Sequence, residues 1–291
     1  MIQPKIEKFS VFAPVKINLS LQIIGRRNDG FHLLESLIVF ADQGDGLTVS
    51  SADTLSLTIK GPFAGSLSTD KNNLVMKAAA LLADFHKIRP KAHIELNKNI
   101  PIASGLGGGS ADAAATLHAL TKLWRFPISD QDLNKIAEQI GSDVPVCLNQ
   151  KSAIMEGIGE RVHRLGNLPK FGILLVNSNF PVSTQEVFQK YEANFSAPGS
   201  LNQIPKDRET LLKLLHSLQN DLTQASINTA PEIKNILSVL SDLDNQLLVR
   251  LTGSGGTCFA LFDNTENAQE AAEKLNKKFP DWWINPTSIL P

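Results

Sequence analysis

Cysteine is scarce in this chain, with two residues among 291. Cys147 and Cys258 lie among apolar neighbours, and their spacing matches no metal site. So few cysteines exclude a disulfide-stapled extracellular scaffold and a cysteine-based zinc site. The pattern predicts two buried thiols in a protein of a reducing compartment.

Excess charge of either sign and long apolar runs are also missing. The formal net charge is -1, which excludes the broad basic field that attracts nucleic acid or an anionic membrane surface. No apolar run approaches the roughly 20 residues that span a membrane, and residues 1–7 lack the charged start and apolar run of a signal peptide. We expect a cytoplasmic protein with no nucleic-acid or membrane partner, and the sequence leaves the oligomeric state open.

The length and the apolar content indicate two domains. A chain of 291 residues exceeds the usual size of one hydrophobic core, and 42% apolar residues are enough to fill two. The polar stretch 161–170, which contains Gly166 and Pro169, precedes a new apolar strand. We therefore predict a boundary there, with domains at residues 1–165 and 166–291 that each mix helices and strands.

Local patterns predict several elements of the first domain. Residues 33–40 and 47–51 have the apolar content of strands, and the polar residues 42–45 between them indicate a solvated turn. Asn73 and Ser129 fit the N-caps of two amphipathic helices. Gly141 is expected to end the second of these helices.

The most informative segment is a glycine-rich loop, residues 101–110, followed by an alanine-rich stretch. Glycines let successive backbone N–H groups turn inward, and a helix after the loop adds its unpaired first-turn N–H groups and the positive end of its dipole. This combination predicts a cradle for a polyphosphate. The residues of the cradle are Pro101, Ile102, Ala103, Ser104, Gly105, Leu106, Gly107, Gly108, Gly109, Ser110 and Ala111.

Two other phosphate-binding motifs do not fit this loop. A P-loop needs a lysine after the glycines, and none follows here. A dinucleotide fingerprint needs a third glycine where this chain has Ser110. The alternative without a ligand is a flexible turn in which Ser110 is the N-cap of the helix.

Two further segments accompany the loop. Residues 13–19 (Ala-Pro-Val-Lys-Ile-Asn-Leu) open an alternating strand, and residues 251–259 place a second glycine loop between two apolar runs. Together with the first loop they resemble the three motifs of the GHMP kinase superfamily. Residues 30–32 (Gly-Phe-His), 141–146 and 156–160 resemble the branch that acts on 4-diphosphocytidyl-2-C-methyl-D-erythritol (CDP-methylerythritol).

The resemblance spans nearly the whole chain and implies a two-domain α+β fold. The N-terminal domain would be like the second domain of ribosomal protein S5, and the C-terminal domain would be ferredoxin-like, with the active site between them. The implied activity is ATP-dependent phosphorylation of the 2-hydroxyl of CDP-methylerythritol, a small molecule of the non-mevalonate isoprenoid pathway. ATP and Mg²⁺ are the implied cofactors. No carboxylate pair marks a magnesium site, although Ser110 could offer a hydroxyl to the ion or to a phosphate oxygen.

Lys16 and Asp143 are the expected catalytic residues. Phosphoryl transfer depends mostly on positioning and charge stabilisation, so it needs a base near the acceptor hydroxyl and cations near the transferring group. By resemblance, Asp143 takes the hydroxyl proton and Lys16 favours its removal. Pro145 is expected to keep Val144 out of helical geometry, which would put Asp143 on a rigid non-helical corner. The alternatives are a solvent-facing lysine and a turn-forming aspartate.

Five residues are expected at the substrate. Asn18 lies two residues after Lys16 on the same face of the strand. By resemblance, Phe31 and His32 contact the cytosine ring, Phe188 is a second aromatic across it, and Thr184 belongs to the same segment as Phe188. Where the family often has Tyr this chain has Phe31, which keeps the stacking face but lacks a hydroxyl. Core packing of Phe188 and a structural role for His32 are the alternatives.

Three rival functions share parts of this pattern. A GHMP kinase for homoserine or a mevalonate-type substrate would keep the glycine loops without needing the aromatic residues. A non-catalytic nucleotide or metabolite sensor on the same fold should have lost Lys16 or Asp143, and both are present. A dinucleotide-dependent oxidoreductase is disfavoured by Ser110.

Overall fold

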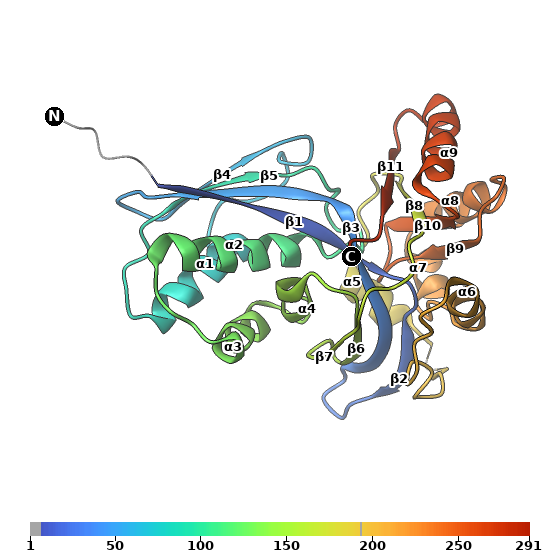
Figure 1. The fold of residues 1–291 in the computed structure, drawn as a ribbon, viewed down its shortest axis with the longest axis horizontal. Helices are drawn as coiled ribbons and strands as arrows, with labels where there is room; N and C mark the ends of the chain where they lie inside the picture. The colour runs from blue at the N-terminus through green and yellow to red at the C-terminus, as the bar shows by residue number, and fades with distance from the viewer. Residues whose placement is uncertain (1–6, 193) are drawn as a thin grey trace. The chain divides into compact units, whose positions relative to one another are not determined.

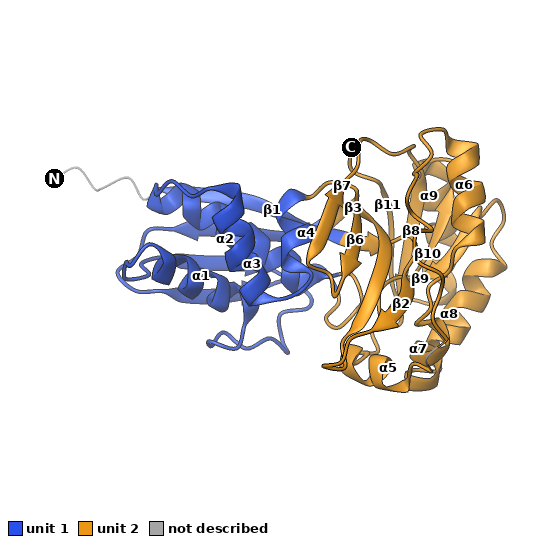
Figure 2. Cartoon of the chain, turned by 90° about the horizontal axis from the view of Figure 1, so that it is seen from below, with its two compact units in different colours: residues 1–15, 44–100, 107–149 blue, residues 16–43, 101–106, 150–291 orange. Residues whose placement is uncertain are grey.

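The computed structural model of the chain describes residues 7–192 and 194–291. Residues 1–6, most of the segment tested for a signal peptide, lie outside the described residues. The chain forms two compact units from interleaved segments (Figure 2). Among the described residues, unit 1 contains residues 7–15, 44–100 and 107–149, and unit 2 contains residues 16–43, 101–106, 150–192 and 194–291. The predicted domains 1–165 and 166–291 are continuous in sequence, whereas these units are interleaved, so the predicted boundary stays a prediction.

Unit 1 is a sheet with helices on one face (Figure 1). Strands β1 (Lys8–Asn18) and β3 (His32–Ser50) both continue into unit 2. Strand β5 (His93–Asn97) pairs antiparallel with β3 and parallel with β4 (Ser56–Lys60), and β1 also pairs with β3. The helices of this unit are α1 (Leu74–Phe85), α2 (Gly108–Trp124), α3 (Asp130–Ile140) and α4 (Val144–Asn149).

The predicted ends of two helices are confirmed. Asn73 Oδ1 accepts a hydrogen bond from the Val75 N–H at 2.9 Å, which caps α1. Ser129 Oγ accepts from the Asp132 N–H at 3.1 Å, which caps α3. Each cap satisfies one of the first-turn N–H groups that have no partner inside the helix, and Gly141 follows the last residue of α3.

The predicted solvated turn at residues 42–45 is wrong. Strand β3 runs without interruption for 19 residues, and Asp45 within it is fully buried. The reason is a partner that is distant in sequence, because Lys98 Nζ lies 2.5 Å from Asp45 Oδ2. A carboxylate is tolerated in a protein interior when it is paired and hydrogen-bonded.

The predicted non-helical corner at Val144 is also wrong. Val144 is the first residue of α4, and the Cys147 N–H donates to the Asp143 carbonyl at 3.3 Å. Pro145 falls in the first turn, where an N–H group would have no partner within the helix, so the proline does not interrupt it. The usual bias of a residue before proline against helical geometry is overridden here. Asp143 therefore immediately precedes a helix.

Unit 2 contains two sets of strands. The N-terminal half of β3 pairs antiparallel with β2 (Gln22–Arg26) and β6 (Ala153–Gly157), and β6 pairs with β7 (Arg161–Arg164). A separate antiparallel sheet has the strand order β11-β8-β10-β9. Its members are β8 (Gly172–Asn177), β9 (Leu248–Leu251), β10 (Thr257–Phe262) and β11 (Trp283–Ser288).

Two helices pack against this second sheet. Helices α8 (Glu232–Ser241) and α9 (Thr265–Lys278) pack against its strands. The central strands β8 and β10 are consequently buried along their whole length. Three further helices complete the unit: α5 (Thr184–Lys190), α6 (Arg208–Ser217) and α7 (Thr223–Thr229).

Two further expectations concern the whole chain. In the part of the chain that the structure describes, no helix is both long enough and apolar enough to cross a membrane. Cys147 and Cys258 are both buried thiols, as predicted. Burial raises the pKa of Cys258 far above its ordinary value, which makes this thiol unreactive.

Candidate functional site

Lys16 lies near the end of β1 and is only 4% exposed. Its Nζ donates to Asn18 Oδ1 at 3.1 Å, and its backbone N–H donates to the Leu106 carbonyl at 3.0 Å. The first contact confirms that the two side chains share one face of the strand. The second ties this strand to the first glycine loop. The burial excludes the solvent-facing alternative for Lys16.

Asn18 is fully buried and anchored on three sides. Besides accepting from Lys16, its Nδ2 donates to Ser36 Oγ at 2.8 Å and its backbone N–H donates to Thr252 Oγ1 at 2.9 Å. The contact with Thr252 joins the strand of Lys16 to the second glycine loop. Ser36 was not predicted as a site residue, because one serine inside an apolar strand carries no sequence signal of its partner.

The two glycine loops pack backbone against backbone within unit 2. A Cβ atom on Gly105 would lie 2.5 Å from the Thr252 carbonyl oxygen, and one on Gly253 would lie 2.7 Å from the Gly105 carbonyl oxygen. Both glycines also have positive φ, 75° and 56°, which disfavours other residues. Close approach of the loops therefore requires these glycines, in addition to any role at a phosphate.

The rest of the predicted cradle begins α2, as expected. Gly107 is the residue before the helix, with a left-handed φ of 65°, and no side chain of the described residues caps it. The first N–H groups of α2 therefore remain available to an anion. Ser110 lies inside the first turn and is partly exposed, so its alternative role as the N-cap is wrong.

A buried charge cluster in unit 1 connects to both ends of this loop. Lys98 Nζ donates to Asp45 Oδ2 at 2.5 Å and to Asp112 Oδ2, within α2, at 2.8 Å. Asp45 Oδ1 accepts from the backbone N–H groups of Asn99 and Ile100 at 2.6 and 3.0 Å. The cluster thus holds the chain just before the glycine loop and the helix just after it.

Burial shapes the charges of this cluster. Burial raises the pKa of Asp112 to about 7; Lys98 opposes this increase and Asp45 adds to it. Burial alone would lower the pKa of Lys98, but the two carboxylates raise it above its ordinary value. Asp112 Oδ1 has no hydrogen-bond partner among the described residues. Sequence reasoning missed this cluster because Lys98 lies 53 residues from Asp45 and 14 residues from Asp112.

Asp143 is partly buried and immediately precedes α4 in unit 1. Lys16 belongs to unit 2. Each residue is therefore described within its own unit, and their joint action on one hydroxyl stays a prediction.

Aromatic side chains gather in unit 2 beside the β2–β3 hairpin. His32 stacks on Phe188 with ring centroids 5.3 Å apart, and Tyr191 meets His32 edge-on at 5.5 Å. Phe31 is 59% exposed. The structure thus brings His32 and Phe188 together, and the exposed Phe31 directly precedes His32 in the chain. Tyr191 was not predicted, although it is the only tyrosine of the chain and follows Phe188 by three residues.

Local contacts define two of these residues further. Burial, helped by the nearby Arg26, lowers the pKa of His32 below its ordinary value, which favours a neutral imidazole. Thr184 begins α5, and its Oγ1 lies 2.7 Å from Ser254 Oγ in the second glycine loop. Thr184 therefore connects the segment that carries Phe188 to that loop.

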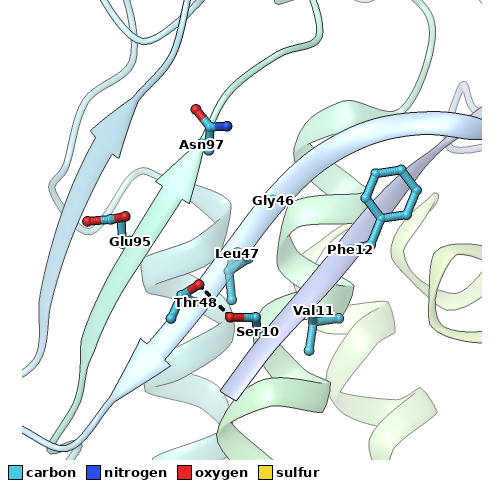
Figure 3. A pocket seen from close by; sticks show the side chains of 8 residues that line it. All are labelled: Ser10, Val11, Phe12, Gly46, Leu47, Thr48, Glu95 and Asn97. Atoms are coloured by element: carbon cyan, nitrogen blue, oxygen red, sulfur yellow. Dashed lines mark hydrogen bonds between the residues drawn. The ribbon is translucent and has the colours of Figure 1, made fainter. Parts of the chain in front are cut away.

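A hollow on the sheet of unit 1 involves none of the predicted site residues. Figure 3 shows side chains from β1, β3 and β5 around it, with Ser10 and Thr48 joined by a hydrogen bond of 2.9 Å. The lining residues are Ser10, Val11, Phe12, Gly46, Leu47, Thr48, Glu95 and Asn97. This mixture contains no cluster of catalytic groups.

No group of three His, Cys, Asp or Glu side chains among residues 7–192 and 194–291 is arranged to hold a metal ion.

Comparisons with known proteins bear on the whole chain. The model of the GHMP kinases N terminal domain matches residues 73–151, and that of the GHMP kinases C terminal domain matches residues 199–281. The chain is 42% identical to the 4-diphosphocytidyl-2-C-methyl-D-erythritol kinase of Paramagnetospirillum magneticum, over 97% of this chain and 99% of the relative. It is 44% identical to the kinase of that name from Parvibaculum lavamentivorans, over 94% and 95%.

Solved structures agree with these matches. A crystal structure of 4-(cytidine 5'-diphospho)-2C-methyl-D-erythritol kinase superposes with a TM-score of 0.79 and 29% identity, covering 97% of this chain and 100% of that one. Homoserine kinase from Cytophaga hutchinsonii has a TM-score of 0.76 at 19% identity, over 100% and 96% of the two chains, which shows the fold alone. The resemblance to GHMP kinases and the two-domain α+β fold expected from it are confirmed.

Proposed function

The chain belongs to the 4-diphosphocytidyl-2-C-methyl-D-erythritol kinase family of the GHMP kinases, and we propose that it phosphorylates the 2-hydroxyl of CDP-methylerythritol with ATP. The observation that carries this proposal is the similarity to kinases of that name, at 42% and 44% identity, over nearly the full length of both chains. Such a reaction belongs to the non-mevalonate route to isoprenoid precursors. A cytoplasmic location stays a prediction.

The glycine loop and the start of α2 are the proposed site of the ATP phosphates. The first turn of α2 supports this role, because no side chain among the described residues caps it. Residues 101–106 would contribute backbone from the packed loops, and residues 107–111 would contribute the helix terminus. The cluster of Lys98, Asp45 and Asp112 keeps the two flanks of the loop in place.

Lys16 and Asp143 are the proposed catalytic residues. Asp143 would accept the proton of the substrate hydroxyl, and Lys16 would stabilise the negative charge that develops as the proton leaves. The burial of Lys16 and its contact with Asn18 support the second role, because a fixed cation needs no rearrangement during the reaction.

We also propose that Mg²⁺ binds together with the ATP phosphates. Mg²⁺ usually keeps several waters and takes one or two donors from the protein together with the substrate phosphates. Ser110 fits such a donor, because its side chain is partly exposed in the uncapped first turn of α2. When bound, the ion would neutralise charge on the phosphates.

A coupled ADP-release assay tests the proposed function. The protein should release ADP with CDP-methylerythritol far faster than with homoserine or mevalonate. A faster release of ADP with homoserine or mevalonate would support kinase activity but contradict CDP-methylerythritol as the substrate. ATP binding without transfer to any of the three would favour the sensor.

The aromatic group leads to a prediction about substrate choice. Phe31→Ala should weaken CDP-methylerythritol binding by about 1–3 kcal/mol, the usual worth of one base stacked on an aromatic ring, and should leave ATP affinity nearly unchanged. The exposure of Phe31, 59%, means that folding should be unaffected. Calorimetric titration of both ligands measures the difference. Phe85→Ala, which removes another exposed ring, is the control; equal weakening of both ligands by Phe31→Ala would contradict the stacking role.

A further inference from the structure

The hydroxyl of Ser36 has a defined direction. Ser36 Oγ donates to the Ser20 carbonyl at 2.5 Å and accepts from Asn18 Nδ2 at 2.8 Å. A serine hydroxyl carries one hydrogen. Once that hydrogen points at a carbonyl oxygen, which cannot donate, Ser36 can only accept on its other side. The group of Asn18 that faces Ser36 must therefore be its amino group.

The other end of the Asn18 carboxamide leads to the same orientation. An ammonium group has donors only, so the atom of Asn18 that lies 3.1 Å from Lys16 Nζ must be its oxygen. The assignment of oxygen and nitrogen thus follows from both hydrogen-bond partners. The backbone of Asn18 is held as well, because its N–H donates to Thr252 Oγ1 at 2.9 Å.

We propose that Ser36 is a positioning residue of the phosphoryl transfer and that it acts through Asn18 on Lys16. The Ser20 carbonyl orients the Ser36 hydroxyl, the hydroxyl orients the Asn18 carboxamide, and the carboxamide oxygen holds the ammonium of Lys16. Asn18 is then also a positioning residue rather than a substrate ligand, because its side chain is fully buried and faces Lys16 and Ser36. This inference rests on the proposed function of Lys16.

Loss of the Ser36 hydroxyl would act on the ammonium through the carboxamide. The Asn18 amino group would lose its acceptor in a buried place, where an unsatisfied donor is costly. If the carboxamide turned over to find another partner, it would present N–H groups to the ammonium, and two donors cannot pair. Lys16 would then leave its position, and a displacement of about 1 Å at a reacting group can lower a rate about 100-fold.

Ser36→Ala is therefore expected to lower kcat by about 10-fold to 100-fold and to leave the KM values for ATP and CDP-methylerythritol nearly unchanged. Asn18→Ala should behave in the same way. The control is Thr287→Val in β11, which removes a buried hydroxyl of the same unit that has no partner in the described part of the chain. This variant should keep the kcat of the unaltered protein.

A double-mutant cycle separates positioning from a general loss of structure. Single-turnover rates are measured for Ser36→Ala, Lys16→Met and the double variant, at saturating ATP. If Ser36 acts through Lys16, Ser36→Ala should have almost no further effect once Lys16 is replaced. The same fold-loss in both backgrounds would show that Ser36 only supports the structure, and would overturn the proposal.

Two other results would also overturn it. A raised KM for CDP-methylerythritol with an unchanged kcat in Asn18→Ala would make Asn18 a substrate ligand. An unchanged rate in folded Ser36→Ala would show that Ser36 does not position Lys16 through Asn18, although the proposed function would stand. If the unaltered protein instead prefers another alcohol, the proposed substrate is wrong. The same double-mutant cycle, run with that alcohol, still tests whether Ser36 acts through Asn18 on Lys16.

Discussion

Asp143→Asn is expected to lower kcat by about 10²- to 10⁴-fold, the usual contribution of a general base, while ATP binding persists. The substitution keeps the size and shape of the side chain and removes the proton acceptor and the negative charge. Asp143 immediately precedes α4 and is partly buried, so the amide should be accommodated without unfolding. Single-turnover phosphoryl transfer to CDP-methylerythritol at saturating ATP, together with an ATP titration, measures the two effects separately.

Lys16→Met provides the comparison for that variant. It should lower the same rate by a different route, because the developing negative charge loses a buried cation. If the two residues act as one unit, the double variant should be far less impaired than the product of the two single losses. Near-normal transfer by Asp143→Asn would rule out the general-base role. Strictly multiplicative losses would show that the two residues act independently.

The second large effect concerns stability. Lys98→Met should lower the free energy of unfolding by about 3–5 kcal/mol, because removing one partner of a buried ion pair leaves an uncompensated charge. Here two carboxylates, Asp45 and Asp112, would lose their shared cation, and Lys98 itself is only 3% exposed. Urea unfolding measures the loss. A change below about 1 kcal/mol, the range of exposed pairs, would contradict the structural role of the cluster.

Asp112→Asn is the matched variant within the cluster. It leaves one lysine with one aspartate and removes a carboxylate whose Oδ1 has no partner among the described residues, so its cost in unfolding free energy should be much smaller than that of Lys98→Met.

Asp112→Asn should also change how the free energy of unfolding depends on pH. Burial raises the pKa of Asp112 from 3.8 to about 7, so between these values the folded chain binds more protons at this residue than the unfolded chain. Its contribution to stability is therefore present at low pH and is lost as the pH rises through 7.

The pH effect is measurable as a difference between two proteins. Between pH 4 and pH 7, the unfolding free energy of the unaltered protein should fall relative to that of Asp112→Asn. An identical pH profile in both proteins would mean that Asp112 titrates normally in the folded state.

Residues near one another in sequence were predicted well. The caps Asn73 and Ser129 are confirmed, because a cap needs only a suitable side chain two or three residues before its N–H partner. The shared face of Lys16 and Asn18 is confirmed for the same reason, since alternation along a strand is local. The helix after the glycine loop is confirmed as well.

Predictions that depended on distant partners were wrong or missing. The polar residues 42–45 indicated a turn, but the segment is continuous strand, and Lys98, 53 residues away, pairs with the buried carboxylate of Asp45. Ser36 gained its place in the site from Ser20 and Asn18, which lie on other strands or loops. The error at Val144 did not involve a distant partner. The residue before a proline usually avoids helical geometry, but Pro145 lies in the first turn of α4, where its missing N–H costs no hydrogen bond.

The sequence by itself determined the family, through its ordered motifs, and the helix that follows the glycine loop, through local backbone preferences. The two-domain α+β fold followed from the resemblance to that family. Only the tertiary structure decided how the glycines are used and which polar groups are buried together. Gly105 and Gly253 allow two loops, about 150 residues apart, to pack closely, and the orientation of Asn18 follows from Ser36 and Lys16 together. Such pairings depend on distances in space, since a buried donor is satisfied by whichever acceptor the fold brings to it.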